Sequence, residues 1–219
     1  MYRSVKCGAY ALARAVTRAS EIRAIEDSHI VLQSSSTAAF FGIADGVGAW
    51  QAIRNVDPCK YGKQLLANVY AKFDRKEKDS LVQMKEALHA SDHLNKLAGI
   101  EGSCTVAIGL ADGEGVNVIG IGDVMHILVR EYRRVHFASS PQLKSLQQPF
   151  QLGYFGKENE HLFQSVLADA YELRFSVQPG DLLITIQSIH QDWRKQLFTA
   201  STSSSTRKIR ICSPTRLRS

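Results

Sequence analysis

An aspartate followed by a glycine, Asp45-Gly46, ends a short apolar stretch of the chain. This stretch, Ala39 to Ala44, is too short and too uniformly apolar for a surface helix. It predicts a strand buried on both faces, with the Asp45 carboxylate at its end. Glycine at position 46 allows the backbone to turn and leaves its own carbonyl oxygen free to approach a ligand. A carboxylate beside a backbone carbonyl offers two hard oxygen donors, which suit Mg²⁺ or Mn²⁺.

The same dipeptide is also the commonest signal for a hairpin turn. Asp112-Gly113 is an internal comparison, because the runs Cys104 to Ala111 and Val116 to Ile121 on either side of it both have strand character. We therefore predict a turn there. No alternating strand resumes after Asp45-Gly46, because the following Val47 to Trp50 leads into a polar stretch. A ligand role and a simple turn both remain open at this position.

Further acids lie close to predicted strand ends. Glu26 and Asp27 precede Ser28 to Gln33, an alternating segment that predicts a strand. Adjacent side chains of an extended chain point to opposite faces, so at most one of the two can face a given metal ion. A solvated strand end is the alternative. Asp123 follows Gly122, and this pair fits a hairpin turn as well as a ligand position.

The elements that must position these acids are a mixture of strands and helices, which predicts an α+β fold. The predicted helices are Tyr61 to Phe73 and Ser80 to Leu97, with Asp79 as N-cap of the second and Leu81, Met84, Leu88, Ser91 and Leu94 on its buried face. The predicted strands are Ser103 to Ala111, Val116 to Ile121, Met125 to Arg130, Val135 to Ala138, Tyr171 to Val177 and Asp181 to Ile186. Pro179-Gly180 is a predicted turn, and Ser139 to Gly156 is a predicted loop. His89 and His93 are spaced i, i+4 on the second helix, but without a third ligand they predict a solvated face.

Composition narrows the possible classes of protein. The 219 residues are enough for one domain with a sizeable core. No apolar run approaches the ~18 residues of a membrane span, so we expect none. The four cysteines are scattered without C-x-x-C spacing, which argues against a zinc site or disulfide scaffold and for a reducing compartment. The net charge of +6 belongs to the two ends of the chain, which supports only non-specific contact with nucleic acid.

Four ordered segments carry a resemblance to a known family. The run Phe41 to Trp50, followed by Val56-Asp57-Pro58, resembles the signature of the type 2C metal-dependent protein phosphatases (the PPM family), in particular the branch with organellar members. Ile25 to Ser28, Gly102 to Thr105 and Ile121 to Asp123 resemble the same branch in the same order. The resemblance runs from about Cys7 to Ile186. It implies a β-sandwich of two mainly antiparallel sheets flanked by helices, incomplete at the C-terminus.

The resemblance also implies a function. It implies a protein serine/threonine phosphatase that hydrolyses phosphoserine and phosphothreonine monoesters with a water activated by two Mn²⁺ or Mg²⁺ ions. Asp45 would bridge the ions, with Glu26 and the Gly46 carbonyl on one of them, Asp27 as a supporting neighbour and Asp123 near a weaker, additional ion. The partner would be a phosphoprotein and the chain a monomer. The expected location is intracellular, in a mitochondrion or chloroplast or otherwise in the cytoplasm.

The sequence departs from the family pattern near its end. Ser188 and Ile189 occupy the positions of a metal-binding Asp-Gly pair, and Asp192 is the next acid. The alternative is therefore an impaired pseudophosphatase that binds phosphoproteins, or an artefactual C-terminus. We expect a partial phosphatase-like domain over residues 1–193 and a disordered basic tail over 194–219.

Arg23 is displaced by one position from the family's phosphate-binding arginine. Residues 1–20 fit either a targeting remnant or the opening strand of the domain.

Overall fold

The structure is a computed structural model that describes residues 5–9, 26–72, 80–112, 114–131, 134–145, 148–159 and 168–187. All of these residues belong to the first of two compact units of the chain, Met1–Ser188. The expectations for Arg23, Asp79, Ser188, Ile189, Asp192 and the tail 194–219 lie outside the described residues. Among the described helices, none is both long and apolar enough to cross a membrane.

The larger sheet has six strands, and all of its pairs are antiparallel. Its order is β1-β2-β3-β4-β10, and β9 pairs with β3. The strands are β1 (Asp27–Gln33), β2 (Ala39–Gly46), β3 (Gly102–Ala111), β4 (Val116–Ile121), β9 (Leu152–Tyr154) and β10 (Tyr171–Phe175).

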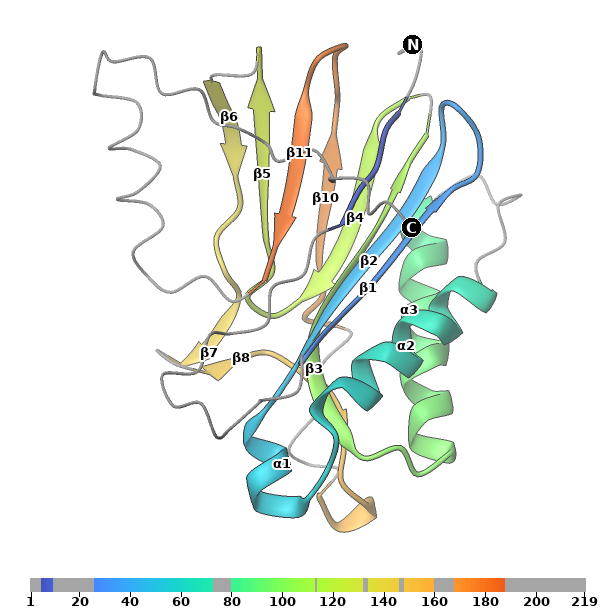
Figure 1. The fold of residues 1–219 in the computed structure, drawn as a ribbon, viewed down its shortest axis with the longest axis vertical. Helices are drawn as coiled ribbons and strands as arrows, with labels where there is room; N and C mark the ends of the chain where they lie inside the picture. The colour runs from blue at the N-terminus through green and yellow to red at the C-terminus, as the bar shows by residue number, and fades with distance from the viewer. Residues whose placement is uncertain are drawn as a thin grey trace, which may run out of the picture. The chain divides into compact units, whose positions relative to one another are not determined.

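A second, three-stranded sheet has the order β11-β5-β6 and is also antiparallel. Its strands are β5 (Met125–Arg130), β6 (Arg134–Ala138) and β11 (Leu182–Ile186). A separate pair joins β7 (Leu143–Ser145) to β8 (Gln148–Pro149). Figure 1 shows the three-stranded sheet on one side of the larger sheet and the long helices on the other. The predicted α+β fold with two antiparallel sheets is confirmed.

Apolar side chains fill both spaces beside the larger sheet. Between the sheets, Ala107 and Val118 pack with Val124 and Leu128, and the rings of Phe137 and Phe175 meet edge to face at 5.3 Å. On the opposite face the sheet packs against helices α2 (Pro58–Lys72) and α3 (Ser80–Leu97). Burial of apolar surface on both faces of one sheet stabilises this three-layer arrangement.

The helices follow the sequence pattern closely. Helix α3 has the predicted bounds, whereas α2 begins at Pro58, three residues before the predicted start. One predicted core position is wrong, because Leu94 is 38% exposed and Asn95 is buried instead. Asn95 Nδ2 donates to the carbonyl oxygen of Tyr61 at 3.1 Å, which compensates for burying a polar side chain between the helices. The short helix α1 (Ala49–Arg54) was not predicted.

One connection that the sequence left open and one predicted loop are now defined by the structure. Gly122-Asp123 is not a hairpin, because it joins β4 of one sheet to β5 of the other. Gly122 has φ of 99°, a conformation that favours glycine. The predicted loop Ser139 to Gly156 contains β7, β8 and β9, and Leu152 and Phe155 within it are buried in the core. The turn at Asp112 is confirmed, since its carboxylate accepts hydrogen bonds from the backbone at positions 114 and 115.

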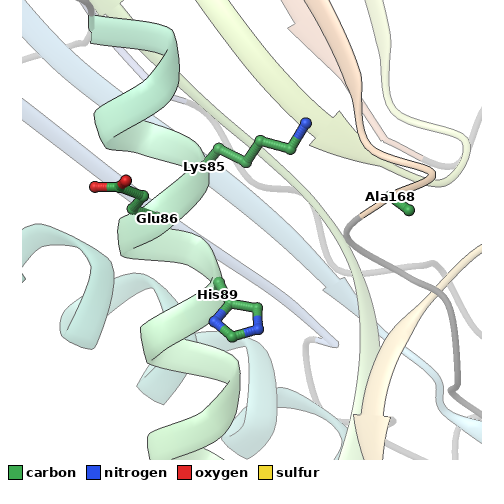
Figure 2. Close-up of a pocket in the computed structure, with 4 residues that line it drawn as sticks. All are labelled: Lys85, Glu86, His89 and Ala168. Atoms are coloured by element: carbon green, nitrogen blue, oxygen red, sulfur yellow. The ribbon is translucent and has the colours of Figure 1, made fainter.

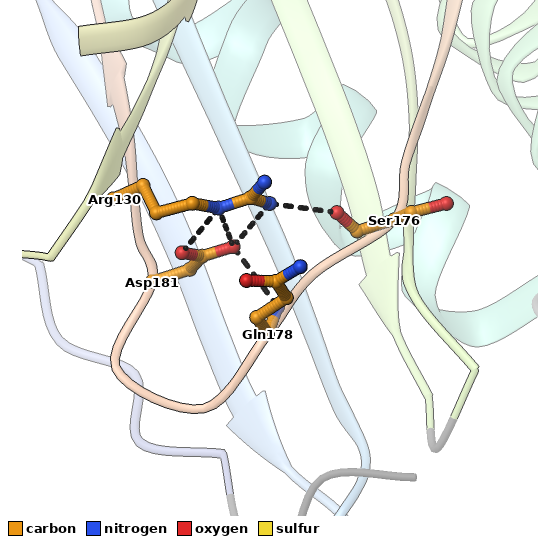
Figure 3. Close-up of polar contacts among 4 residues, drawn as sticks. All are labelled: Arg130, Ser176, Gln178 and Asp181. Carbon is orange, nitrogen blue, oxygen red and sulfur yellow. Dashed lines mark hydrogen bonds and ion pairs between the residues drawn. The ribbon is translucent and has the colours of Figure 1, made fainter. Parts of the chain in front are cut away.

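The start of β11 is fixed by a charged pair (Figure 3). Arg130 on β5 donates from Nε and Nη2 to the carboxylate of Asp181, at 3.0 and 2.9 Å. The same carboxylate accepts the backbone N–H of Gln178 at 2.9 Å across the turn at Pro179-Gly180. Hydrogen bonding from Arg130 lowers the pKa of Asp181. The pair therefore ties β11 to β5 just before the last described residues of the chain.

Candidate metal centre

Three polar side chains form a row across one end of the larger sheet. In the strand register Asp27 of β1 is opposite Asp45 of β2, and Asp45 is opposite Thr105 of β3. Residues directly opposite each other in antiparallel strands place their side chains on the same face. Ala44 faces helix α2, because its Cβ is 2.9 Å from the position that a Cβ on Gly62 would take. Asp45 therefore faces the second sheet, on the side where Ile43 joins the core between the sheets.

Gly46 belongs to strand β2 and does not form the turn that the sequence left open at this position. Its backbone N–H donates to the carbonyl oxygen of Glu26 at 3.1 Å, and its register partner is Cys104. A Cβ at Gly46 would lie 1.9 Å from the carbonyl oxygen of Pro58. Glycine is required here because α2 begins very close to the strand.

The chain turns two residues later, beside Glu26. A Cβ at Gly48 would lie 2.0 Å from Oε1 of Glu26, so the Glu26 carboxylate occupies the space that Gly48 leaves empty. The Trp50 indole N–H donates to Ser103 Oγ at 2.7 Å, and the Trp50 ring lies 4.2 Å from that of Phe155. These contacts fix the segment that follows Asp45.

Asp123 lies where the chain crosses between the sheets. Gln142 holds this crossing, because its backbone N–H donates to the carbonyl oxygen of Gly122 and its side-chain oxygen accepts the Gly122 N–H, both at 3.0 Å. Gln142 Nε2 also donates to the carbonyl oxygen of Asp169. Burial raises the pKa of Asp123, and its own backbone N–H and the nearby hydroxyl of Thr105 oppose this shift. Sequence reasoning missed Gln142, since a polar residue in a predicted loop gives no indication that it holds a crossing between two sheets.

The donor chemistry of this region fits a hard divalent cation. The side chains of Asp27, Asp45 and Asp123 and the backbone carbonyl at Gly46 offer only oxygen. Thr105 is 3% exposed, and its hydroxyl oxygen is buried without a hydrogen-bond partner of good geometry. A buried polar atom without a partner, between two carboxylates, is consistent with a site for an ion and its water.

The structure brings some predicted site residues together and not others. Asp27 and Asp45 are cross-strand neighbours, and Thr105 connects their row to the crossing at Asp123. Within the described residues, however, no three His, Cys, Asp or Glu side chains form one group that could hold a metal ion. Cys104 is buried, which raises the pKa of its thiol, and it faces the helix side. It therefore takes no part in the row.

A separate pocket lies on the helix side of the larger sheet (Figure 2). It has a volume of about 350 Å³ and is lined by Lys85, Glu86 and His89 of α3 and by Ala168. Lys85 forms an ion pair at 3.1 Å with Glu172 of β10. The pocket is not part of the carboxylate row, which faces the second sheet. His89 is exposed, as is His93 one turn further along, in agreement with the predicted solvated face.

Proteins of known sequence resemble the chain over 73% of its length. The probable protein phosphatase 2C 26 of Arabidopsis thaliana is 30% identical over 160 residues, which cover 49% of that protein. The protein phosphatase PTC7 homolog fig of Drosophila willistoni is 29% identical over 170 residues, which cover 51% of that protein. The chain thus spans about half the length of the curated relatives it matches. No family model matches it.

Solved structures share the fold. The photosystem II phosphatase PBCP superposes with a TM-score of 0.62 at 21% identity, covering 82% of this chain and 67% of that chain. A serine/threonine phosphatase of S. agalactiae superposes with a TM-score of 0.54 at 12% identity, covering 84% of this chain and 88% of that chain. Fold, motif order and sequence relatives agree, and the chain belongs to the type 2C (PPM) family of protein phosphatases.

Proposed function

We propose that this chain carries the metal-binding face of a protein serine/threonine phosphatase that acts on phosphoserine and phosphothreonine in proteins. The observation that supports the proposal most directly is the row of Asp27, Asp45 and Thr105 at the end of the larger sheet. This row faces the space between the sheets, and the resemblance of the Asp45 segment to the family signature gives Asp45 the central role.

The proposed cofactors are two Mn²⁺ or Mg²⁺ ions. Asp45 would be shared by both, Glu26 and the Gly46 carbonyl would hold one of them, and Asp123 would contribute to a weaker, additional position. When bound, such ions lower the pKa of a water and neutralise charge on the phosphoryl oxygens.

The protein's own residues would orient this chemistry. Asp45 is held at a strand end by backbone pairing on both sides, to β1 and β3, so its carboxylate has a defined direction. Asp27 adds a second negative charge on the same face. Thr105 offers a hydroxyl that can donate to a carboxylate or accept from a water. Gln142 fixes the backbone next to Asp123.

The substrate would be a phosphoprotein, and the organellar location suggested by the resemblance remains a prediction. The relatives are named protein phosphatases, which supports phosphatase activity for this chain. The activity is a proposal, because the chain covers only about half of the relatives' length. The alternative is a pseudophosphatase that binds phosphoproteins without turnover. The experiment described next distinguishes the two.

The test is phosphate release from a phosphothreonine peptide in the presence of Mn²⁺. The proposal predicts release that EDTA abolishes and that Asp45→Asn lowers by at least about 100-fold, since metal catalysis supplies several kcal/mol. Asp112→Asn is the matched control, because Asp112 also precedes a glycine but lies in a hairpin turn. Release that survives both EDTA and Asp45→Asn contradicts the proposal. Mn²⁺ binding without any release would identify a pseudophosphatase.

A further inference from the structure

Buried polar atoms without hydrogen-bond partners are rare in folded proteins, and this chain has them on two residues of its described part. Among the described residues, the buried side-chain nitrogen and oxygen atoms without a hydrogen bond of good geometry are Thr105 Oγ1, which lies near the Asp123 carboxylate, and both amide atoms of Gln187. Most buried polar groups are hydrogen-bonded, so a buried amide with neither atom satisfied requires an explanation. Leaving such a group unpaired costs free energy of folding, which a bound ligand would recover.

The position of Gln187 follows from the strand before it. Strand β11 ends at Ile186, which is opposite Met125 of β5. Continuing this antiparallel register by one residue places Gln187 opposite Val124, the neighbour of Asp123. Gln187 therefore ends its strand beside the crossing between the two sheets.

The direction of the Gln187 side chain follows from strand alternation. Two residues earlier, Thr185 Oγ1 contacts Nδ1 of His126 at 3.0 Å, and Nε2 of His126 contacts the hydroxyl of Tyr171 on the larger sheet at 3.0 Å. Thr185 thus points into the space between the sheets. Side chains two apart share a face, so Gln187 points into the same space.

Thr105 approaches the same crossing from the larger sheet. A Cβ at Gly122 would lie 2.6 Å from Cγ2 of Thr105, so the two residues are in close contact. The Tyr171 hydroxyl also donates to the carbonyl oxygen of Val124 at 3.3 Å, which fixes the other side of Asp123. The unpaired hydroxyl and the unpaired amide therefore flank Asp123 from opposite sheets.

We propose that Gln187 is a further ligand residue of the metal centre, binding through Oε1 the divalent cation beside Asp123. An amide oxygen is a neutral hard donor of the kind that these cations accept from asparagine and glutamine. The Nε2 hydrogens can then donate to an anionic oxygen carried by the same ion. This inference rests on the proposed function, because it assumes that a divalent cation binds at this face.

The experiment is a calorimetric titration of the full chain with Mn²⁺ alone. Gln187→Ala and Gln187→Leu are expected to weaken Mn²⁺ binding by about tenfold, in the range seen when groups around a metal are removed. Gln187→Glu is expected to bind Mn²⁺ at least as tightly as wild type, because it keeps the oxygen and adds negative charge. Gln178→Ala is the matched control, since Gln178 is exposed on the turn before β11.

The melting temperature in EDTA separates a ligand role from a packing role. Gln187→Leu removes the unpaired amide at similar size and is expected to melt no lower than wild type, which shows that weaker Mn²⁺ binding does not reflect unfolding. If Gln187→Ala and Gln187→Leu bind Mn²⁺ within twofold of wild type, the inference is wrong.

The outcomes also distinguish this inference from the proposed function. Loss of Mn²⁺ binding in Asp45→Asn, but not in the Gln187 variants, overturns the role of Gln187 and leaves the phosphatase proposal standing. Mn²⁺ binding that depends on Gln187, in a protein that releases no phosphate, supports the inference and contradicts the phosphatase proposal. A wild-type protein that binds no Mn²⁺ contradicts both.

Discussion

Asp27 and Asp45 lie directly opposite each other on β1 and β2, with their side chains on the same face of the sheet. Like charges in directly opposite positions destabilise a sheet. A divalent cation at this face would replace the repulsion with attraction. We therefore expect this end of the sheet to be less stable without metal than with it.

Asp27→Asn is expected to have opposite effects with and without metal. In EDTA it should raise the free energy of unfolding by about 0.5 kcal/mol, because one of two facing charges is removed. With excess Mn²⁺ the stabilisation by metal should become smaller, since a negative charge beside the metal ligands is lost. Urea unfolding under both conditions measures the two effects. An equal response to Mn²⁺ in variant and wild type would show that Asp27 does not support the metal centre.

Two glycines near the centre should respond differently to alanine. In Gly46→Ala the new Cβ would meet the backbone oxygen of Pro58 at 1.9 Å, so α2 or β2 must move, at a cost of about 1–3 kcal/mol or more. In Gly48→Ala the new Cβ would meet the end of the flexible Glu26 side chain, which can rotate away. We therefore expect Gly48→Ala to fold normally and to bind Mn²⁺ more weakly.

Urea unfolding and Mn²⁺ titration of both glycine variants check this pair of expectations. Gly46→Ala is the control for simple loss of stability, because its clash does not depend on Glu26. Mn²⁺ affinity in Gly48→Ala equal to that of wild type would exclude Glu26 as a ligand.

His126 gives the fold a predictable dependence on pH. Its side chain is fully buried between Thr185 and Tyr171, and burial lowers the pKa of His126 to about 4 from its ordinary 6.5. The unfolded chain takes up this proton at higher pH than the folded chain does. Stability is therefore complete above about pH 6.5 and is lost as the pH falls towards 4.

His126→Gln should remove this part of the pH dependence. Between pH 7 and pH 5 wild type is expected to lose about 2 kcal/mol more than the variant, and urea unfolding at the two pH values measures the difference. His29→Gln is the matched control, because His29 is exposed on β1. Equal losses in wild type and His126→Gln would show that His126 is not held neutral by the fold.

Local sequence patterns predicted the elements better than the connections between them. The periodicity of Ser80 to Leu97 and the Asp112 turn were confirmed because nearby residues determine both. The sequence of Gly122-Asp123 fits a hairpin turn as well as a ligand position, and the structure shows that its two strands belong to different sheets. The choice between a hairpin and a crossing depends on long-range packing, which local propensity does not contain.

The site shows the same limit. Asp45 was identified because a polar residue ends an apolar strand, and Gln187 carries the same signal at the end of Leu182–Ile186. The family pattern has its metal-binding aspartate one position later, at Ser188, so the pattern itself does not select Gln187. Thr105 belongs to the family-like segment Gly102 to Thr105, but its place beside Asp45 depends on strand pairing between distant segments. Gln142 also acts through a distant contact, and its local sequence gives no reason to select it.

The most direct test of the account is calorimetric titration of wild type, Asp45→Asn and Asp112→Asn with Mn²⁺. The account predicts that wild type and Asp112→Asn bind Mn²⁺ with the same affinity and that Asp45→Asn loses at least tenfold, since affinity for these ions follows the charge and number of oxygen ligands. Mn²⁺ binding by Asp45→Asn that matches wild type would contradict the account.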